Sequence, residues 1–410
     1  MSMMHAYRDP RLSPRLPRVC VGWARRAARA LTTGLSALGL AVGALAVVPA
    51  PARAEDVITT QEYFSYYHLD TARAKGYTGK GVTIALFDGP VDTSAPELKG
   101  ASITDKSRCT IEASAATRSH GTGMASMLVS PTFGVAPDAT LLTYQSSATE
   151  DISLGSCENI GGVRHNSISH LINQAIDDGA QIISLSQGSE ATGDGVKWAI
   201  ARAMNEGVII VNSAGNTGAD NNSNQLSKWS GVVGVAAITA DGQRASYSSW
   251  GNGVTTAAFG NPVASRNYET GKIEDTNGTS NSAALVSGML ALAWQKWPDA
   301  TANQLLQVLT HTGLNPNHEW NPYTGYGPID GGALVNTDPS QYPDENPLAQ
   351  KEGGSSPTVQ EVQDYADGVV EPNPDTLDRS YVYRGIDEVA ASMDDVGPVH
   401  LGTSPRYHRK

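Results

Sequence analysis

The sequence lacks several features that would place it outside the ordinary soluble globular proteins. Its 410 residues contain no repeats, which excludes fibrous and repeat architectures. No long apolar run follows Val48, which excludes a membrane span from the rest of the chain. An excess of positive charge is also missing, because 29 basic residues face 41 acidic ones. What the chain has, 40% hydrophobic residues and 42 glycines, is enough to bury one large core or two moderate ones.

The first 54 residues differ in composition from everything after them. Seven arginines between Arg8 and Arg29 precede an apolar run at residues 35–48, and the small-residue motif Ala52-Arg53-Ala54 follows. An export signal typically has a basic start, an apolar segment and a small-x-small cleavage site. The apolar segment here is shorter than a membrane span, which needs about 20 residues. We expect cleavage after Ala54 and a secreted, extracellular protein; an uncleaved membrane anchor is the alternative.

Removal of this segment changes the charge and the cysteine count. It takes away eight basic residues and one acidic residue, so the net charge moves from −12 to −19, and nucleic acid is not an expected partner. Of the three cysteines, Cys20 leaves with the signal, and Cys109 and Cys157 remain. An even pair in an exported chain predicts one disulfide; the alternative is two unrelated thiols.

The carboxyl-terminal part is rich in Pro, Gly and acidic residues and poor in apolar ones, as in Tyr342-Pro343-Asp344-Glu345 and Gly353-Gly354-Ser355. Such a composition does not bury enough apolar surface to form a core, and it predicts a flexible acidic tail. We therefore expect a signal peptide at residues 1–54, a folded domain at residues 55–338 and a tail at residues 339–410.

Between these ends, short Val- and Ile-rich runs alternate with longer segments of helical periodicity. The pattern predicts strands at residues 82–87, 140–144, 181–184, 208–212 and 232–237, and helices at 120–130, 166–178, 194–205, 279–297 and 301–310. This alternation is typical of a parallel sheet covered by helices on both faces, a three-layer αβα fold. Ligands bind such folds in a crevice at the carboxyl ends of the strands.

Three polar residues stand at expected strand ends or helix starts. Asp88 ends the first strand, His120 opens a helix, and Ser280 begins a long apolar helix. Each has an ordinary structural explanation: a turn after a strand, a histidine at a helix start and a serine N-cap. Their joint occurrence favours function, because Asp, His and Ser in this chain order match the triad of subtilisin.

Longer segments of the chain resemble the subtilase family over about residues 77–335. The matching segments are Gly79 to Asp88, His120-Gly121-Thr122-Gly123, Gly134 to Ala139, Ser213-Ala214-Gly215-Asn216, Gly278-Thr279-Ser280 and Gly325 to Asp330. The stretch from Gly134 to Ser147 is similar to the mycosin branch, whose members accompany type VII secretion. The resemblance implies a subtilisin-like fold and a serine endopeptidase, with residues 55–338 as the peptidase domain.

The resemblance also implies a role for each matched residue. Ser280 would be the nucleophile, His120 the general base and Asp88 the carboxylate that orients the imidazole. Asn216 would donate a hydrogen bond to the oxyanion. An extended substrate would lie between two segments, which are Ser186, Gln187 and Gly188 on one side and Ser213, Ala214 and Gly215 on the other.

Three departures from the family pattern support a second hypothesis. Gly89-Pro90 follows Asp88 where the family has Thr-Gly, Phe259-Gly260 replaces Pro-Gly, and Asn281 and Ala284 follow Ser280 in place of a small or apolar residue and a proline. None of these changes removes a catalytic atom. The alternative function is a catalytically impaired subtilase-fold binding or scaffold protein, associated with a type VII secretion apparatus.

No cofactor and no metal are expected. The segment at residues 126–134 is too short to contain the calcium loop that many relatives insert there, and no dense acidic loop replaces it. The expected partners are a protein or peptide substrate and, from the mycosin resemblance, a component of a secretion system.

Overall fold

The computed structural model describes residues 57–146, 157, 165–186, 193–220 and 225–369. The expected export signal, the end of the chain after residue 369, Gln187 and Gly188 lie outside these ranges. Across the described ranges, no helix combines the length and hydropathy that a membrane crossing requires.

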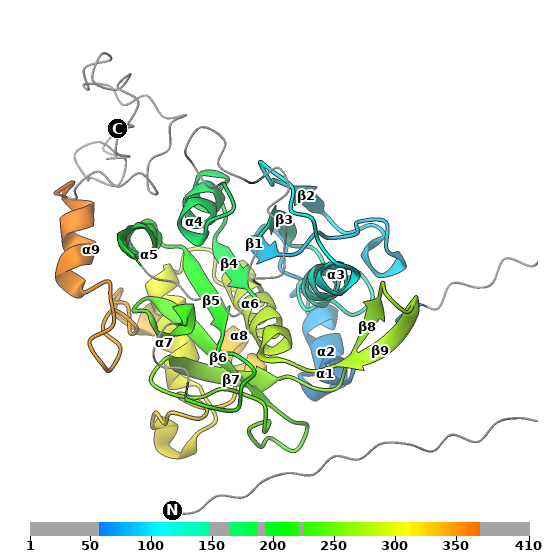
Figure 1. The fold of residues 1–410 in the computed structure, drawn as a ribbon. Helices are drawn as coiled ribbons and strands as arrows, with labels where there is room; N and C mark the ends of the chain where they lie inside the picture. Colours follow the sequence, from blue (N-terminus) through cyan, green and yellow to red (C-terminus); the bar gives the residue numbers. More distant parts are fainter. Residues whose placement is uncertain (1–56, 147–156, 158–164, 187–192, 221–224, 370–410) are drawn as a thin grey trace, which may run out of the picture. The chain divides into compact units, whose positions relative to one another are not determined.

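Seven parallel strands form the central sheet, in the order β2-β3-β1-β4-β5-β6-β7 (Figure 1). They are β1 (Thr83–Asp88), β2 (Ile103–Asp105), β3 (Thr140–Gln145), β4 (Ile182–Leu185), β5 (Ile209–Ser213), β6 (Val232–Ile238) and β7 (Val254–Phe259). All five strands predicted from the sequence are present, each within one residue of its expected bounds. The sequence pattern did not predict strands β2 and β7. Strand β2 is short and polar, and β7 carries two threonines among its apolar residues, so neither forms a clear Val- and Ile-rich run.

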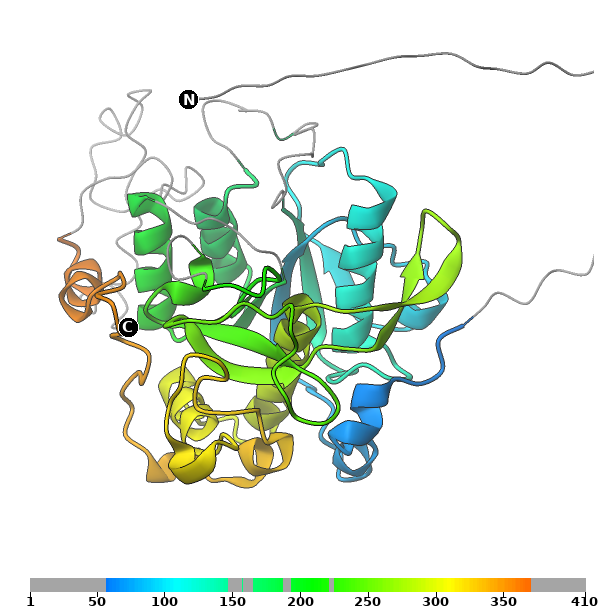
Figure 2. The same cartoon turned by 60° about the horizontal axis from the view of Figure 1, so that its bottom comes forward.

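Helices cover both faces of the sheet, which confirms the three-layer αβα prediction (Figures 1 and 2). One face carries α3 (Ala115–Val129), α6 (Thr279–Lys296), α7 (Ala302–His311), α8 (Gly331–Asn336) and the short α1 (Glu62–Tyr66) and α2 (Leu69–Ala74). The other face carries α4 (Ile168–Asp177) and α5 (Asp194–Glu206). Short 3₁₀ turns include η1 (Pro96–Leu98) and η3 (Leu226–Lys228).

Alternation along β1 places its last residue on a defined face. Ile84 and Leu86 belong to the core under α3 and α6, whereas Ala85 and Phe87 belong to the core under α4 and α5. Because successive side chains of a strand point to opposite faces, Asp88 lies on the face of α3 and α6. It therefore reaches the carboxyl edge of the sheet on the side where both His120 and Ser280 are found.

Helix α3 begins earlier than expected, and this corrects the prediction that His120 opens a helix. The helix starts at Ala115, where the Ser114 side chain caps it by accepting a hydrogen bond from the Thr117 N–H at 3.1 Å. Serine is a favoured N-cap and alanine is the best helix former, so the run Ser114-Ala115-Ala116 extends the helix by more than a turn. His120 consequently lies inside the helix.

An antiparallel hairpin that the sequence pattern did not predict separates β7 from α6. It consists of β8 (Val263–Asn267) and β9 (Lys272–Thr276), and its polar residues hide the strand periodicity. It lies beside α3 (Figures 1 and 2), and a Cβ added at Gly123 of α3 would stand 2.7 Å from the Ser265 hydroxyl oxygen. The glycine therefore permits the close approach of the helix and the hairpin.

Residues 339–369 pack against the domain and do not form the flexible tail expected there. Helix α9 (Val359–Ala366) starts with a capping box between Thr358 and Glu361 and lies against α5, where Glu361 pairs with Lys197 at 3.1 Å. The composition does not predict this packing. A segment that packs on a domain already formed needs only a few apolar residues of its own. We propose that the compact unit extends to about residue 369.

The expected disulfide between Cys109 and Cys157 is present, with Cα atoms 5.1 Å apart. The bridge ties the segment between β2 and α3 to the segment before α4 across 48 residues of sequence. Together with Ile111, the two cysteines form a small buried cluster of their own.

Lys351 anchors the carboxyl-terminal segment in an unusual way. Its side chain is buried, and its Nζ donates to the carbonyl oxygens of Ser227 at 2.6 Å and Gly253 at 2.9 Å. Within the described residues no carboxylate pairs with it. Burial therefore lowers the pKa of Lys351 to about 7.

This burial predicts that stability rises with pH. Between pH 7 and 10 the unfolded chain binds more protons at Lys351 than the folded chain, so the free energy of unfolding should increase by about 1 kcal/mol from pH 7 to pH 8. Urea denaturation of the wild type and of Lys351→Met at both pH values measures this increment, which should be present only in the wild type. Equal pH dependence in the two proteins would contradict it.

Candidate active site

Asp88 lies at the end of β1 and is almost fully buried, with 1% of its surface exposed. Its Oδ1 accepts a hydrogen bond from the Gly89 N–H at 2.7 Å and lies 2.8 Å from Nδ1 of His120. The second oxygen, Oδ2, is buried and has no hydrogen-bond partner within the described residues. Asp88 therefore directs its one strong side-chain contact at the imidazole.

Two glycines let the helix that carries His120 approach Asp88. A Cβ on Gly121 would stand 2.4 Å from the carbonyl oxygen of Gly89, and a Cβ on Gly89 would stand 2.4 Å from the carbonyl oxygen of Thr117. Neither distance is possible for a real side chain. Gly89 follows Asp88 at a position where the family has threonine. The packing of α3 therefore requires glycine at this position.

The electrostatics of His120 follow from this contact. Its side chain is 36% exposed. Burial of the rest of the ring disfavours protonation, but the charge of Asp88 and the hydrogen bond that the ring donates to Asp88 outweigh burial and raise the pKa of His120 above its ordinary value. The carboxylate thus stabilises the imidazolium and holds Nδ1 as the protonated nitrogen, which leaves Nε2 as the basic one.

Ser280 is the second residue of α6 and is 8% exposed. Its hydroxyl donates to the carbonyl oxygen of Ser186 at 2.5 Å, and within the described residues no hydrogen bond joins it to His120. Both residues nevertheless line one cavity of about 280 Å³. Catalytic hydrogen bonds are often long or poorly aligned in free enzymes and tighten when substrate binds.

Asn216 lines the same cavity, and Thr279 fixes its orientation. Its Oδ1 accepts from the Thr279 N–H at 2.9 Å and from the Thr279 hydroxyl at 3.0 Å. Since a main-chain N–H only donates, the oxygen must face Thr279, and the amide NH₂ faces away from it. Thr279 was not among the site residues expected from the sequence; only its place in the Gly278-Thr279-Ser280 segment pointed to it.

The described structure contains four of the six predicted substrate-binding residues, and they lie where the neighbouring strands β4 and β5 end. Ser186 follows β4 and Ser213 ends the neighbouring β5, but neither they nor Ala214 and Gly215 line the cavity of His120 and Ser280. The N–H groups of Ala214 and Gly215 are already bonded, to the Val235 carbonyl and to the Thr279 hydroxyl. Their role in binding stays a prediction, and Gln187 and Gly188 lie outside the described residues.

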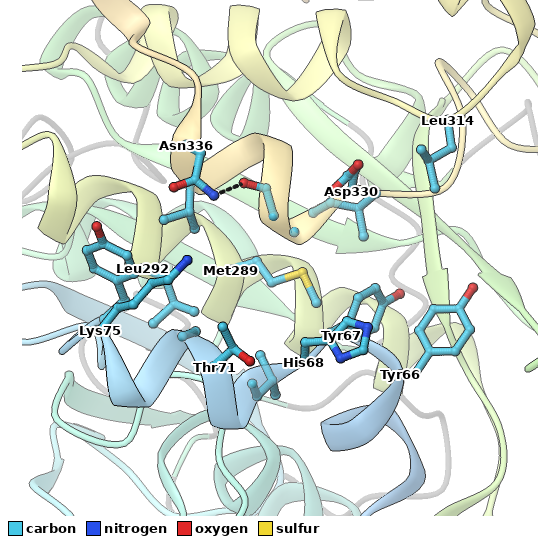
Figure 3. A pocket seen from close by; sticks show the side chains of 17 residues that line it. Tyr66, Tyr67, His68, Thr71, Lys75, Met289, Leu292, Leu314, Asp330 and Asn336 are labelled. Carbon is cyan, nitrogen blue, oxygen red and sulfur yellow. Dashed lines mark hydrogen bonds between the residues drawn. The ribbon is translucent and has the colours of Figure 1, made fainter.

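A larger cavity of about 370 Å³ lies between the α1–α2 segment and helices α6 and α8 (Figure 3). Its walls include Tyr66, His68 and Lys75 on one side and Met289 and Asp330 on the other. None of Asp88, His120, Asn216 or Ser280 reaches it. Within the described part of the chain, no three His, Cys, Asp or Glu side chains are grouped so that they could hold a metal ion. Size therefore does not identify the candidate site; the arrangement of its functional groups does.

Known proteins resemble this chain over most of the folded region. A thermostable alkaline protease of Halalkalibacterium halodurans is 30% identical over 256 residues, which cover 60% of this chain and 66% of that protein. Mycosin-1 of Mycolicibacterium smegmatis is 29% identical over 344 residues, which cover 70% of this chain and 75% of that protein. Among solved structures, MycP1 from the ESX-1 type VII secretion system aligns with a TM-score of 0.57 and 26% identity, over 72% of this chain and 91% of that one.

The comparison with protein families gives the same result. The profile described as "Subtilase family" matches residues 79–327, more than half of the chain, and this range contains Asp88, His120, Asn216 and Ser280. The resemblance stated from the sequence motifs is confirmed, and the protein belongs to the subtilase family of serine endopeptidases.

Proposed function

We propose that the protein is an exported serine endopeptidase that hydrolyses peptide bonds through Ser280, His120 and Asp88 and an acyl-enzyme intermediate. One observation carries the proposal: the 2.8 Å contact between Asp88 Oδ1 and His120 Nδ1 adjoins a cavity that Ser280 and Asn216 also line. A group of residues that only stabilised the fold would not need a base, a hydroxyl and an amide donor around one cavity.

The first half of the reaction uses His120 as a base and then as an acid. The Ser280 hydroxyl leaves the Ser186 carbonyl, transfers its proton to Nε2 of His120 and attacks the substrate carbonyl carbon. The C–N bond of the tetrahedral intermediate then breaks, and the imidazolium returns the proton to the leaving amine. Asp88 holds the ring through Nδ1 and stabilises the imidazolium. Water repeats the two steps on the acyl-enzyme and releases Ser280.

The negative charge on the carbonyl oxygen is stabilised by two donors. One is the Asn216 amide, whose direction is set by the two bonds from Thr279. The other is the N–H of Ser280 at the amino terminus of α6, where the helix dipole adds partial positive charge. Because both groups are held before substrate arrives, they need little reorganisation during the reaction.

We also propose that residues 1–54 direct export and are removed, which leaves a strongly acidic extracellular peptidase whose substrates are proteins or peptides. The similarity to mycosin-1 and to MycP1, a protein of a type VII secretion system, supports a secretion-system component as a partner.

A second function, a non-catalytic scaffold, is favoured by one set of observations. The Ser280 hydroxyl is bonded to Ser186, Asp88 Oδ2 lacks a partner within the described residues, and Pro90 has no N–H to supply one. A protein of this kind would retain the fold and a partner-binding surface without turnover.

A fluorophosphonate probe separates the two functions. Protein lacking residues 1–54 should be labelled covalently, and Ser280→Ala should abolish both labelling and peptide hydrolysis, because the probe needs an activated serine. The matched control is Ser287→Ala, which removes another buried serine of α6 whose hydroxyl donates to a main-chain carbonyl, that of Ala283. Unlabelled wild-type protein, or equal labelling of Ser280→Ala, would reject the peptidase and leave the scaffold.

The raised pKa of His120 predicts the acid limb of the pH profile. His120 must be neutral to accept the Ser280 proton, so kcat/KM should fall as the pH decreases through the pKa of His120, with a midpoint above the ordinary value of about 6.5. Hydrolysis of a peptide substrate measured from pH 5 to pH 9 gives the midpoint. A midpoint below 6 would mean that Asp88 does not stabilise the imidazolium.

The oxyanion role of Asn216 has a graded test. Asn216→Ala should lower kcat by about 10² to 10³ with little change in KM, the loss found for the corresponding donor in subtilisin. Asn216→Asp is the sharper variant, because it keeps an oxygen to accept both Thr279 bonds but offers no donor. It should lose at least as much activity at an unchanged melting temperature. A tenfold loss or less in either variant would show that the donor is misassigned.

A further inference from the structure

We propose that Tyr268, at the tip of the β8–β9 hairpin, is a positioning residue that holds Asp88 and His120 at their bonding distance. The inference rests on the proposed function of this pair, and it concerns a hairpin whose role no sequence motif indicated. Among the described residues, no hydrogen bond joins Tyr268 to Asp88 or His120. The tyrosine acts through the two chain segments that carry them.

The first contact joins the hairpin to the loop after Asp88. The Tyr268 hydroxyl donates to Oδ2 of Asp92 at 2.8 Å, and the Arg118 guanidinium pairs with the same oxygen at 2.9 Å. The Ser94 N–H and hydroxyl occupy the other oxygen of Asp92, and the Asp92 N–H donates to the Thr122 hydroxyl at 3.0 Å. Asp92 thus fastens the loop that begins at Asp88 both to the hairpin and to α3.

The second contact joins the hairpin to α3 beside His120. The Tyr268 N–H donates to the Ser119 hydroxyl at 2.8 Å, and the guanidinium of Arg118 lies over the Tyr268 ring, 4.7 Å from its centre. Arg118 and Ser119 precede His120, and Thr122 follows it. The helix is therefore held on both sides of His120 by the same cluster, which consists of Asp92, Arg118, Ser119, Thr122 and Tyr268.

The hairpin is itself held firmly enough to serve as a support. Arg266 of β8 makes two contacts with the buried carboxylate of Glu97 in η1, at 2.6 Å and 3.3 Å. At its base, the Thr276 hydroxyl donates to the Val263 carbonyl at 3.0 Å, and the chain then enters α6 at Thr279. The support thus reaches from the loop of Asp88, past His120, to the helix of Ser280.

The charges suit a permanent connection. Burial opposes ionisation of Asp92, but hydrogen bonds from Ser94 and Tyr268 and the charge of Arg118 outweigh it and lower the pKa of Asp92. Burial and the bond to Asp92 raise the pKa of Tyr268 to about 12, so its hydroxyl remains a donor at neutral pH. Helix α3 and the loop touch at Gly89 and Gly121 with no side chain between them. If the contacts of this cluster loosen, the helix and the loop therefore move relative to each other, and the distance from Asp88 to His120 changes.

Tyr268→Phe tests the proposal, since it deletes the hydroxyl and keeps the ring under Arg118 and the N–H to Ser119. Relative to the wild type, kcat per fluorophosphonate-titrated site should fall about tenfold, with KM within about twofold. The pKa of His120, measured by NMR titration, should also fall, because a looser Asp88 stabilises the imidazolium less. The charged side chains that line the cavity of His120 together with it, which are Arg266, Glu269 and Glu274 on the hairpin, are unchanged in this variant, as is the pair of Arg118 and Asp92.

Tyr323→Phe is the matched control, an exposed tyrosine that also stacks on an arginine, Arg244, and it should leave kcat and the pKa of His120 unchanged. Asp92→Asn should act in the same direction as Tyr268→Phe, and the double variant should be no worse than Asp92→Asn alone. A lower melting temperature in Tyr268→Phe with unchanged kcat per site and unchanged His120 pKa would overturn the proposal, as would full additivity.

The titration also separates this proposal from the proposed function. The His120 pKa reports the Asp88–His120 pair whether or not the protein hydrolyses peptides. A wild type without turnover, combined with a lower His120 pKa in Tyr268→Phe, would reject the peptidase and retain the positioning role. An active wild type with an identical His120 pKa and identical kcat in Tyr268→Phe would do the reverse.

Discussion

The candidate site depends on one contact, the bond between the buried carboxylate of Asp88 and the ring of His120. A buried carboxylate is costly unless its charge is compensated, and here the Gly89 N–H and the imidazole provide that compensation on one oxygen. The contact exists only because α3 lies against the loop after β1 at two glycines. Packing of main chain on main chain therefore sets the chemistry of the site.

The residues after Asp88 acquire a physical meaning in this arrangement. Gly89 stands where the family has threonine, and a side chain there would overlap the Thr117 carbonyl. The loss of the threonine hydroxyl is thus coupled to the position of α3. The cluster around Asp92 and Tyr268 supplies, from a hairpin far along the chain, a support for the same loop. Gly89, which differs from the family pattern, and the Asp92–Tyr268 cluster therefore act on the same loop.

Helix α6 connects the other half of the site to the core. Its first two residues serve the cavity: Thr279 orients Asn216, and Ser280 presents its hydroxyl and N–H. The residues that follow, through Trp294, are buried between the sheet and the helices of one face. A helix buried along its length moves little, so the nucleophile and the oxyanion donor keep a fixed relation to the strand edge that carries Asp88.

The sequence by itself determined the layers, five strands and the disulfide, because each leaves a local mark such as a Val- and Ile-rich run or an even cysteine pair, and its motifs named Asp88, His120, Ser280 and Asn216 as candidate site residues. It did not reveal that α3 begins at Ala115, that Thr279 orients Asn216, that the β8–β9 hairpin supports Asp88 and His120, or that Lys351 and α9 dock on the domain. These features are contacts between residues distant in the chain, made by ordinary polar residues. Only the folded backbone, which brings such segments within hydrogen-bonding distance, decides them.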